Sequence, residues 1–67
     1  MFIARDLRTG TVLAEARTPM RAKRLAAPLM EADPLCVEVE ITCDTTPGVI
    51  RETMTRQEMV GWLHVYE

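Results

Sequence analysis

The feature that most constrains the fold is an alternation of apolar and polar residues from Leu35 to Cys43. Successive side chains of a β-strand point to opposite faces of its sheet, so the pattern predicts a strand with one buried face. We expect the odd positions to face the core: Leu35, Val37, Val39, Ile41 and Cys43. Glu38 and Glu40, followed by Asp44, then form an acidic row on the opposite face, which Glu52 could extend.

Two β-hairpins are predicted from the turn residues. The segments 2–7 and 11–16 flank Arg8-Thr9-Gly10, whose glycine can take the positive φ that a three-residue hairpin loop requires. The strand 35–43 is followed by Asp44-Thr45-Thr46-Pro47-Gly48, in which the Pro-Gly pair favours a type II turn. A weaker strand is expected over 49–54.

Each hairpin leads into a signal for the start of a helix. Thr18 is a candidate N-cap with Pro19 at the first helical position, so a helix is expected over 20–32, where Asp33-Pro34 ends it. Its expected apolar face consists of Ala22, Leu25, Ala26 and Leu29. Pro28 predicts that the helix kinks there or stops near Ala27.

The C-terminal segment favours a second helix. Thr55 and Glu58 have the spacing of a capping box, and Met59, Trp62, Leu63 and Tyr66 follow at helical intervals. The alternative is a last strand over 60–66, which is rich in β-forming residues and contains Gly61. The stripe of Met59, Trp62 and Tyr66 belongs either to the core or to a contact with a partner or a second copy in a homodimer.

These elements predict an α+β fold in the order β-β-α-β-β-α, with an antiparallel sheet and helices packed on one face. Sixty-seven residues correspond to a single domain, 1–67. The chain has only three aromatic residues and five methionines, so an aliphatic, methionine-rich core is expected. Cys36 and Cys43 lie too far apart along one strand to form a disulfide with each other.

Charge is unevenly distributed along the chain. Residues 1–24 have a net charge of +4 and the remainder has −6, so the total of −2 hides a polarised molecule. Arg17, Arg21 and Arg24 fall on one helical stripe with Lys23 beside it, which is either a solvated face or a surface for phosphates. No aromatic residue is interleaved with this stripe to stack on bases.

The acidic row of Glu38, Glu40 and Asp44, with Glu52, is the other candidate surface. It fits a protein partner with a basic surface, although the same charges could simply keep an open sheet face soluble or pair with Arg5 or Arg51.

Catalytic and metal-binding residues are sparse. His64 is the only histidine, serine is absent, and neither cysteine has a nearby histidine or a second cysteine at metal-binding spacing. We therefore expect no enzyme activity, no metal and no cofactor.

No apolar run is long enough for a membrane span, and charges at Arg5, Asp6 and Arg8 interrupt the position of a signal peptide, so a cytoplasmic location is expected. The expected function is a small protein-binding module, an inhibitor, adaptor or accessory factor of the kind that phages and mobile elements also encode. The alternative is a nucleic-acid-binding protein that uses its basic first helix.

Overall fold

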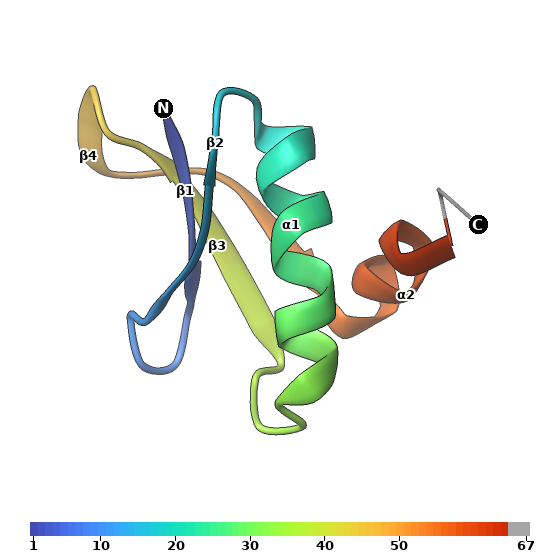
Figure 1. Cartoon of the computed structure of the whole chain (residues 1–67). Coiled ribbons are helices and arrows are strands. Elements are labelled where there is room, and N and C mark those ends of the chain that lie inside the picture. Colours follow the sequence, from blue (N-terminus) through green and yellow to red (C-terminus); the bar gives the residue numbers. More distant parts are fainter. Residues whose placement is uncertain (65–67) are drawn as a thin grey trace.

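The computed structural model describes residues 1–64. The fold is a four-stranded sheet with two helices. Figure 1 shows that the helices lie on one side of the sheet. The strands are β1 (Phe2–Asp6), β2 (Val12–Ala16), β3 (Glu38–Cys43) and β4 (Thr46–Thr55), and the helices are α1 (Pro19–Ala32) and α2 (Arg56–His64). All neighbouring strands are antiparallel, in the order β2-β1-β3-β4. The predicted α+β class and element order are confirmed.

The first hairpin forms as its sequence predicts, with β1 and β2 joined at Gly10. This glycine has φ of 76°, and its amide donates to the Asp6 carbonyl at 2.7 Å. An irregularity between Ala4 and Arg5 shifts the register, so that Arg5 lies opposite Val12. On its other edge β1 pairs with β3, so the first hairpin joins the second to form one sheet.

Helix α1 begins at the predicted cap, where the Thr18 hydroxyl accepts a hydrogen bond from the Arg21 amide at 3.1 Å. Of the two alternatives expected at Pro28, a kink or a stop near Ala27, the stop is wrong, since α1 continues through Pro28 to Ala32. Pro28 is exposed, so its ring meets solvent, and the cost is one missing backbone hydrogen bond. The C-cap is Asp33.

The buried face of α1 differs from the predicted one. Leu25 and Leu29 are exposed, whereas the buried residues are Ala22, Lys23, Ala26, Ala27 and Met30. Alanines on α1 meet alanines of the sheet, Ala4 and Ala16, and small side chains on both sides allow the helix to lie close to the sheet. The rotation of the helix is therefore set by small residues, and the leucines lie outside the contact.

Strand β3 is shorter than the alternation predicts. It begins at Glu38, and both Leu35 and Val37 are exposed, at 64% and 62%. The Asp33 carboxylate accepts a hydrogen bond from the Leu35 amide at 3.0 Å, and the Asp33 carbonyl accepts one from the Cys36 amide at 3.0 Å. These bonds hold the chain in a turn and bury Cys36 instead of its neighbours.

The prediction of a Pro47-Gly48 turn is also wrong. Cys43 pairs with Thr46, so the turn consists of Asp44 and Thr45, and β4 already includes Pro47 and Gly48. The register shifts on both sides of Thr42, which faces Ile50, and the additional residues of β4 form a bulge there. Gly48 supplies the positive φ of 86° in this bulge.

The C-terminal segment is a helix, as favoured, and the alternative strand is wrong over the described residues. The Thr55 hydroxyl accepts a hydrogen bond from the Glu58 amide at 3.3 Å, and Met59 is buried. Trp62 and Leu63 pack against the core in part, and Tyr66 lies outside the described residues. Together with Met30 and Met54, Met59 confirms the methionine-rich core.

Arg56 ties the two halves of the fold together at the end of α1. Its Nη1 lies 3.0 Å from the Met30 carbonyl oxygen, 3.0 Å from that of Asp33 and 2.7 Å from that of Cys36. These carbonyls belong to the last turn of α1 and the turn after it, so the guanidinium adds a side-chain donor at the helix end, where the Met30 and Asp33 carbonyls also accept backbone amides.

Candidate functional sites on two faces

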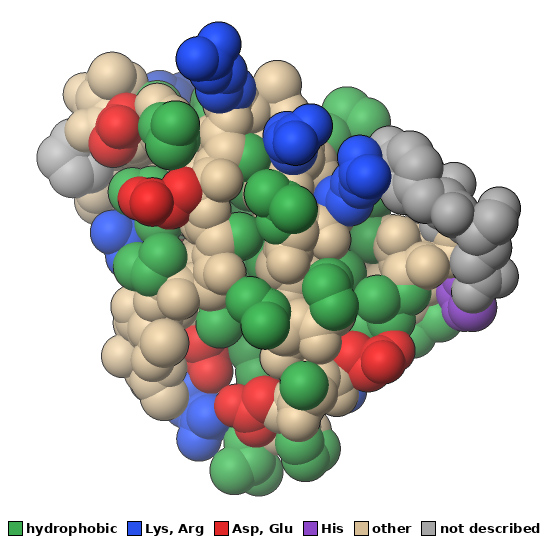
Figure 2. Space-filling model, in the orientation of Figure 1, with side chains coloured by type: hydrophobic (Ala, Val, Ile, Leu, Met, Phe, Trp, Pro, Cys, Tyr) green, Lys and Arg blue, Asp and Glu red, His purple; other side chains and the backbone are tan. Residues whose placement is uncertain are grey.

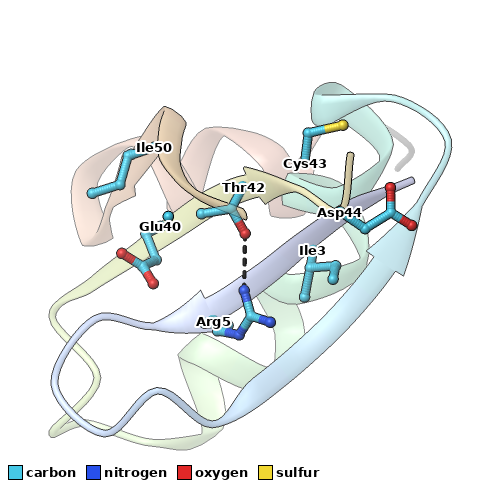
Figure 3. A pocket seen from close by; sticks show the side chains of 8 residues that line it. Ile3, Arg5, Glu40, Thr42, Cys43, Asp44 and Ile50 are labelled. Atoms are coloured by element: carbon cyan, nitrogen blue, oxygen red, sulfur yellow. Dashed lines mark hydrogen bonds between the residues drawn. The ribbon is translucent and has the colours of Figure 1, made fainter. Parts of the chain in front are cut away.

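The face of the sheet that the helices leave uncovered carries a mixed set of side chains, here called the open face. It includes Ile3 and Arg5 from β1, Glu15 and Val12 opposite them on β2, Glu38, Glu40 and Thr42 from β3, and Ile50 from β4. These residues alternate with core residues such as Ala4, Val39 and Ile41, which are completely buried on the helix side. Figure 3 shows the labelled members around one hollow, with the helices behind the sheet.

The hollow on the open face has a volume of about 380 Å³. Its lining residues are Ile3, Arg5, Glu40, Thr42, Cys43, Asp44, Gly48 and Ile50. The bulge in β4 produces it, because Gly48 has no side chain to fill the space and Ile50 is displaced to a position opposite Thr42. A small apolar group of a partner would find Ile3 and Ile50 on its walls.

Arg5 is the positively charged residue in the lining of this hollow. Its Nη1 donates to the Thr42 hydroxyl at 2.9 Å, and Thr42 is only 5% exposed. Arg5 is also the cross-strand partner of Glu40 in the register between β1 and β3. The guanidinium therefore offsets part of the charge of the acidic row, as one of the two sequence interpretations anticipated.

The acidic row itself is shorter than predicted. Glu38 and Glu40 lie on the open face and are half-buried. Asp44 lies in the turn, where its Oδ1 is 2.7 Å from the ammonium group of Met1, and this hydrogen bond raises the pKa of the ammonium group. Glu52 does not extend the row, because it lies opposite Ile41 on the helix side and pairs with Lys23 at 3.3 Å.

The basic stripe occupies the start of α1. Arg17, Arg21 and Arg24 are exposed, and Figure 2 shows basic side chains gathered at this end of the helix. Lys23 is not part of that exposed stripe, since it is 7% exposed and its Nζ lies 2.7 Å from Glu58 Oε2. Lys23 and Ala27, four residues apart, lie on the buried side of α1. Lys23 therefore cannot reach a ligand on the exposed side of the helix.

The pKa values of the Lys23 and Glu58 side chains follow from this burial and pairing. Burial alone would lower the pKa of Lys23, but hydrogen bonds to Glu58 and Glu52 outweigh it and raise the pKa above 10.5. Burial alone would raise the pKa of Glu58, but hydrogen bonds from Lys23 and Trp62 outweigh it and lower the pKa below 4.5. Both groups are charged at neutral pH.

Trp62 lies beside the arginine stripe, which the sequence did not anticipate. A groove of about 360 Å³ is lined by Thr18, Met20, Arg21, Arg24 and Trp62. No aromatic residue is interleaved with the arginines along the sequence, as stated above, but the fold brings Trp62 next to them, so the expectation that the stripe lacks an aromatic neighbour is wrong. The groove arises because α2 packs beside α1, a contact between residues far apart in the chain.

Both cysteines are free thiols, as predicted. Cys36 is buried, and burial raises the pKa of its thiol, whereas a hydrogen bond from Thr45 lowers the pKa of the Cys43 thiol. Residues 1–64 contain no group of three or more His, Cys, Asp or Glu side chains arranged to hold a metal ion. Within the same residues, no helix combines the length and apolarity needed to cross a membrane.

Comparison with known proteins gives no relative. No protein-family model, no curated protein and no solved structure matches the chain. The functional argument therefore depends on the geometry of the open face and of the groove.

Several residues of these surfaces escaped the sequence analysis. Ile3, Thr42 and Ile50 show no motif, and their assembly depends on the strand register and on the bulge in β4. Arg5 did not escape it, because Arg5 was already named, with Arg51, as a possible cross-strand partner of the acidic row. Trp62 had no such signal, since only the docking of α2 brings it to the arginines.

Proposed function

We propose that the chain is a non-enzymatic protein-binding module that docks on another protein through the open face of its sheet. One observation carries this proposal: the open face has a hollow in which the aliphatic side chains of Ile3 and Ile50 lie next to Arg5 and Glu40. Glu38 lies two residues before Glu40 on the same face of β3. Protein interfaces commonly combine an apolar centre with a polar rim, and the open face has both.

The chemistry of the open face indicates the kind of partner. Ile50 is 50% exposed and Val49 is 51% exposed, so the β4 side of the hollow presents aliphatic area. Glu38 and Glu40, with Glu15 opposite Ile3, provide three carboxylates against one guanidinium, that of Arg5. A partner that inserts an aliphatic side chain next to lysine or arginine residues would complement both features. The apolar contact would supply most of the affinity, because exposed ion pairs contribute little.

Binding suits this surface better than catalysis. The titratable groups lining the hollow are Arg5, Glu40, Cys43 and Asp44, and Asp44 is paired with the Met1 ammonium group. The hydrogen-bond partner of the Cys43 thiol is the Thr45 hydroxyl, which cannot serve as a general base at neutral pH. A shallow hollow of this kind can hold a side chain in place without activating it.

The same proposal places the module in the cytoplasm as an inhibitor, adaptor or accessory factor. Two free thiols in a small domain fit a reducing compartment, where disulfides are rare. The open face also favours a protein partner over bases stacked on the sheet. The strands contain one aromatic residue, Phe2, and it packs against the core on the helix side.

A capture experiment with charge-reversed variants tests the proposal. The immobilised chain is incubated with nuclease-treated lysate of its native host, and the protein retained is then purified and titrated directly. We expect Glu38→Lys/Glu40→Lys to abolish this binding while its circular dichroism spectrum stays native. The control Glu31→Lys reverses an exposed charge on α1 and should bind as the wild type does. A folded double variant with wild-type affinity would refute the proposal.

A further inference from the structure

The groove beside Trp62 is distinct from the open face, because it lies among the helices on the other side of the sheet. It is formed by the first turns of α1 and by α2, and it is lined by Arg21, Arg24, Met20, Thr18 and Trp62. We propose that this groove binds single-stranded nucleic acid, with the arginines contacting phosphates and Trp62 stacking on a base.

The charge of the groove fits a polyanion. Arg17, Arg21 and Arg24 are all exposed, and the first turn of α1 contains no acidic residue. The acidic residue of α2 is Glu58, and its carboxylate is paired with the ammonium group of Lys23 at 2.7 Å. Arg17 and Arg21 therefore meet a phosphate without a competing carboxylate from the first turn, and Arg24 lines the groove beside Arg21.

Trp62 is held in a fixed orientation beside these arginines. Its Nε1 donates to Glu58 Oε2 at 2.9 Å, and the same oxygen accepts from Lys23. Lys23 and Glu58 thus act as positioning residues for the indole. Trp62 also lines a second, mainly apolar hollow with Gln57, Glu58 and Gly61, so that the indole is accessible from two sides.

The combination of a rigid indole with arginines favours a single strand over other anions. A single strand offers unstacked bases along a charged backbone, and base stacking on an aromatic side chain contributes about 1–3 kcal/mol by alanine substitution. A duplex keeps its bases stacked inside, and an acidic peptide has carboxylates for the arginines but no planar ring for Trp62. Only the single strand uses both parts of the groove.

The sole tryptophan makes the test direct, because the intrinsic fluorescence of the chain reports on this groove. The full chain is titrated with a thymidine oligonucleotide of about 15 nucleotides, which spans the groove. We expect saturable quenching with a Kd in the range of roughly 1–100 μM at physiological salt. Three phosphate contacts predict a salt slope of about −2, which weakens binding roughly 15- to 20-fold between 50 and 200 mM salt.

Two charge-matched variants separate the groove from general attraction to the protein. Arg21→Ala/Arg24→Ala should weaken binding by about tenfold and reduce the magnitude of the salt slope to below about 1. Arg8→Ala/Arg51→Ala removes the same charge from the β1–β2 turn and from β4, and should bind nearly as the wild type does once its fold is verified by circular dichroism.

Three results would overturn the proposal. The first is the absence of saturable quenching, and the second is an equal loss of affinity in the two double variants. The third is equal competition by a poly-glutamate peptide or by duplex DNA, which would show that the groove attracts anions without selecting a single strand.

Discussion

At the scale of single residues, Lys23 and Arg56 are cations that stabilise the fold by joining its elements. Lys23 lies under α1 and joins it to Glu52 of β4 and Glu58 of α2, while Arg56 joins three carbonyls at the end of α1. Removing one partner of such a pair leaves a charge that is poorly solvated, which costs more than the pair itself gains. The short helix α2 therefore depends on polar contacts as well as on Met59.

The pairing of Glu58 predicts a specific dependence of stability on pH. Its pKa in the folded chain is lowered below 4.5, so the pairing stabilises the fold above that pH and this stabilisation is lost as the pH falls through the folded-state pKa. We expect Glu58→Gln to be less stable than the wild type by about 1 kcal/mol at pH 7, because the carboxylate is partly exposed.

Urea unfolding of both proteins at pH 7 and at acidic pH measures this effect. The difference between them should shrink at acidic pH, where Glu58 is protonated. Asp6, whose pKa is lowered first by the hydrogen bond from the Arg8 amide, titrates in both proteins and cancels in the comparison. An undiminished difference in acid would contradict the assigned pairing.

At the scale of elements, alternation predicted the centre of β3 and failed at its start. Val39 and Ile41 are buried as expected, since they lie between β1 and β4 in the sheet. Leu35 and Val37 continue the same pattern but lie in and after the turn that Asp33 holds. Hydrophobic periodicity records which residue types alternate, but it carries no information on where backbone hydrogen bonding to a neighbouring strand begins.

One substitution at two positions tests this boundary. Val39→Asp places a charge in the core, where Val39 is completely buried, and should destabilise the fold by several kcal/mol or abolish it. Val37→Asp changes a side chain that is 62% exposed and should alter the free energy of unfolding by about 0.5 kcal/mol or less. Thermal melts compare the two variants, and equal losses would show that the strand extends back to Val37.

The candidate sites were predictable only in part for a similar reason. The arginine stripe and the pair Glu38 and Glu40 follow from local spacing, so the sequence placed them correctly. Lys23 and Glu52 instead form an ion pair with each other, and Trp62 lies beside Arg21. Both arrangements depend on contacts between elements that are distant in the chain. Local patterns determine which face a residue takes on its own element, and packing determines what lies opposite.

At the scale of the whole molecule, the charge step along the sequence becomes two separate surfaces. The open face of the sheet presents Glu38 and Glu40 beside the hollow that Ile3 and Ile50 line, and the start of α1 presents the arginines beside Trp62. The core and the internal ion pairs lie between them. This arrangement would let one small chain contact a protein with one side and a single strand with the other, which combines the two proposed activities.

The measurement that tests the role of the open face most directly compares two aliphatic residues of equal exposure. Ile50 on the open face is 50% exposed and Val60 on α2 is 49% exposed, so an aspartate at either position carries a similar structural cost. With the partner captured by the wild-type chain, calorimetric titration should show Ile50→Asp weakened about tenfold or more, a loss of about 1.4 kcal/mol, and Val60→Asp unchanged. Wild-type affinity for a folded Ile50→Asp, or an equal loss in Val60→Asp, would contradict docking through the open face.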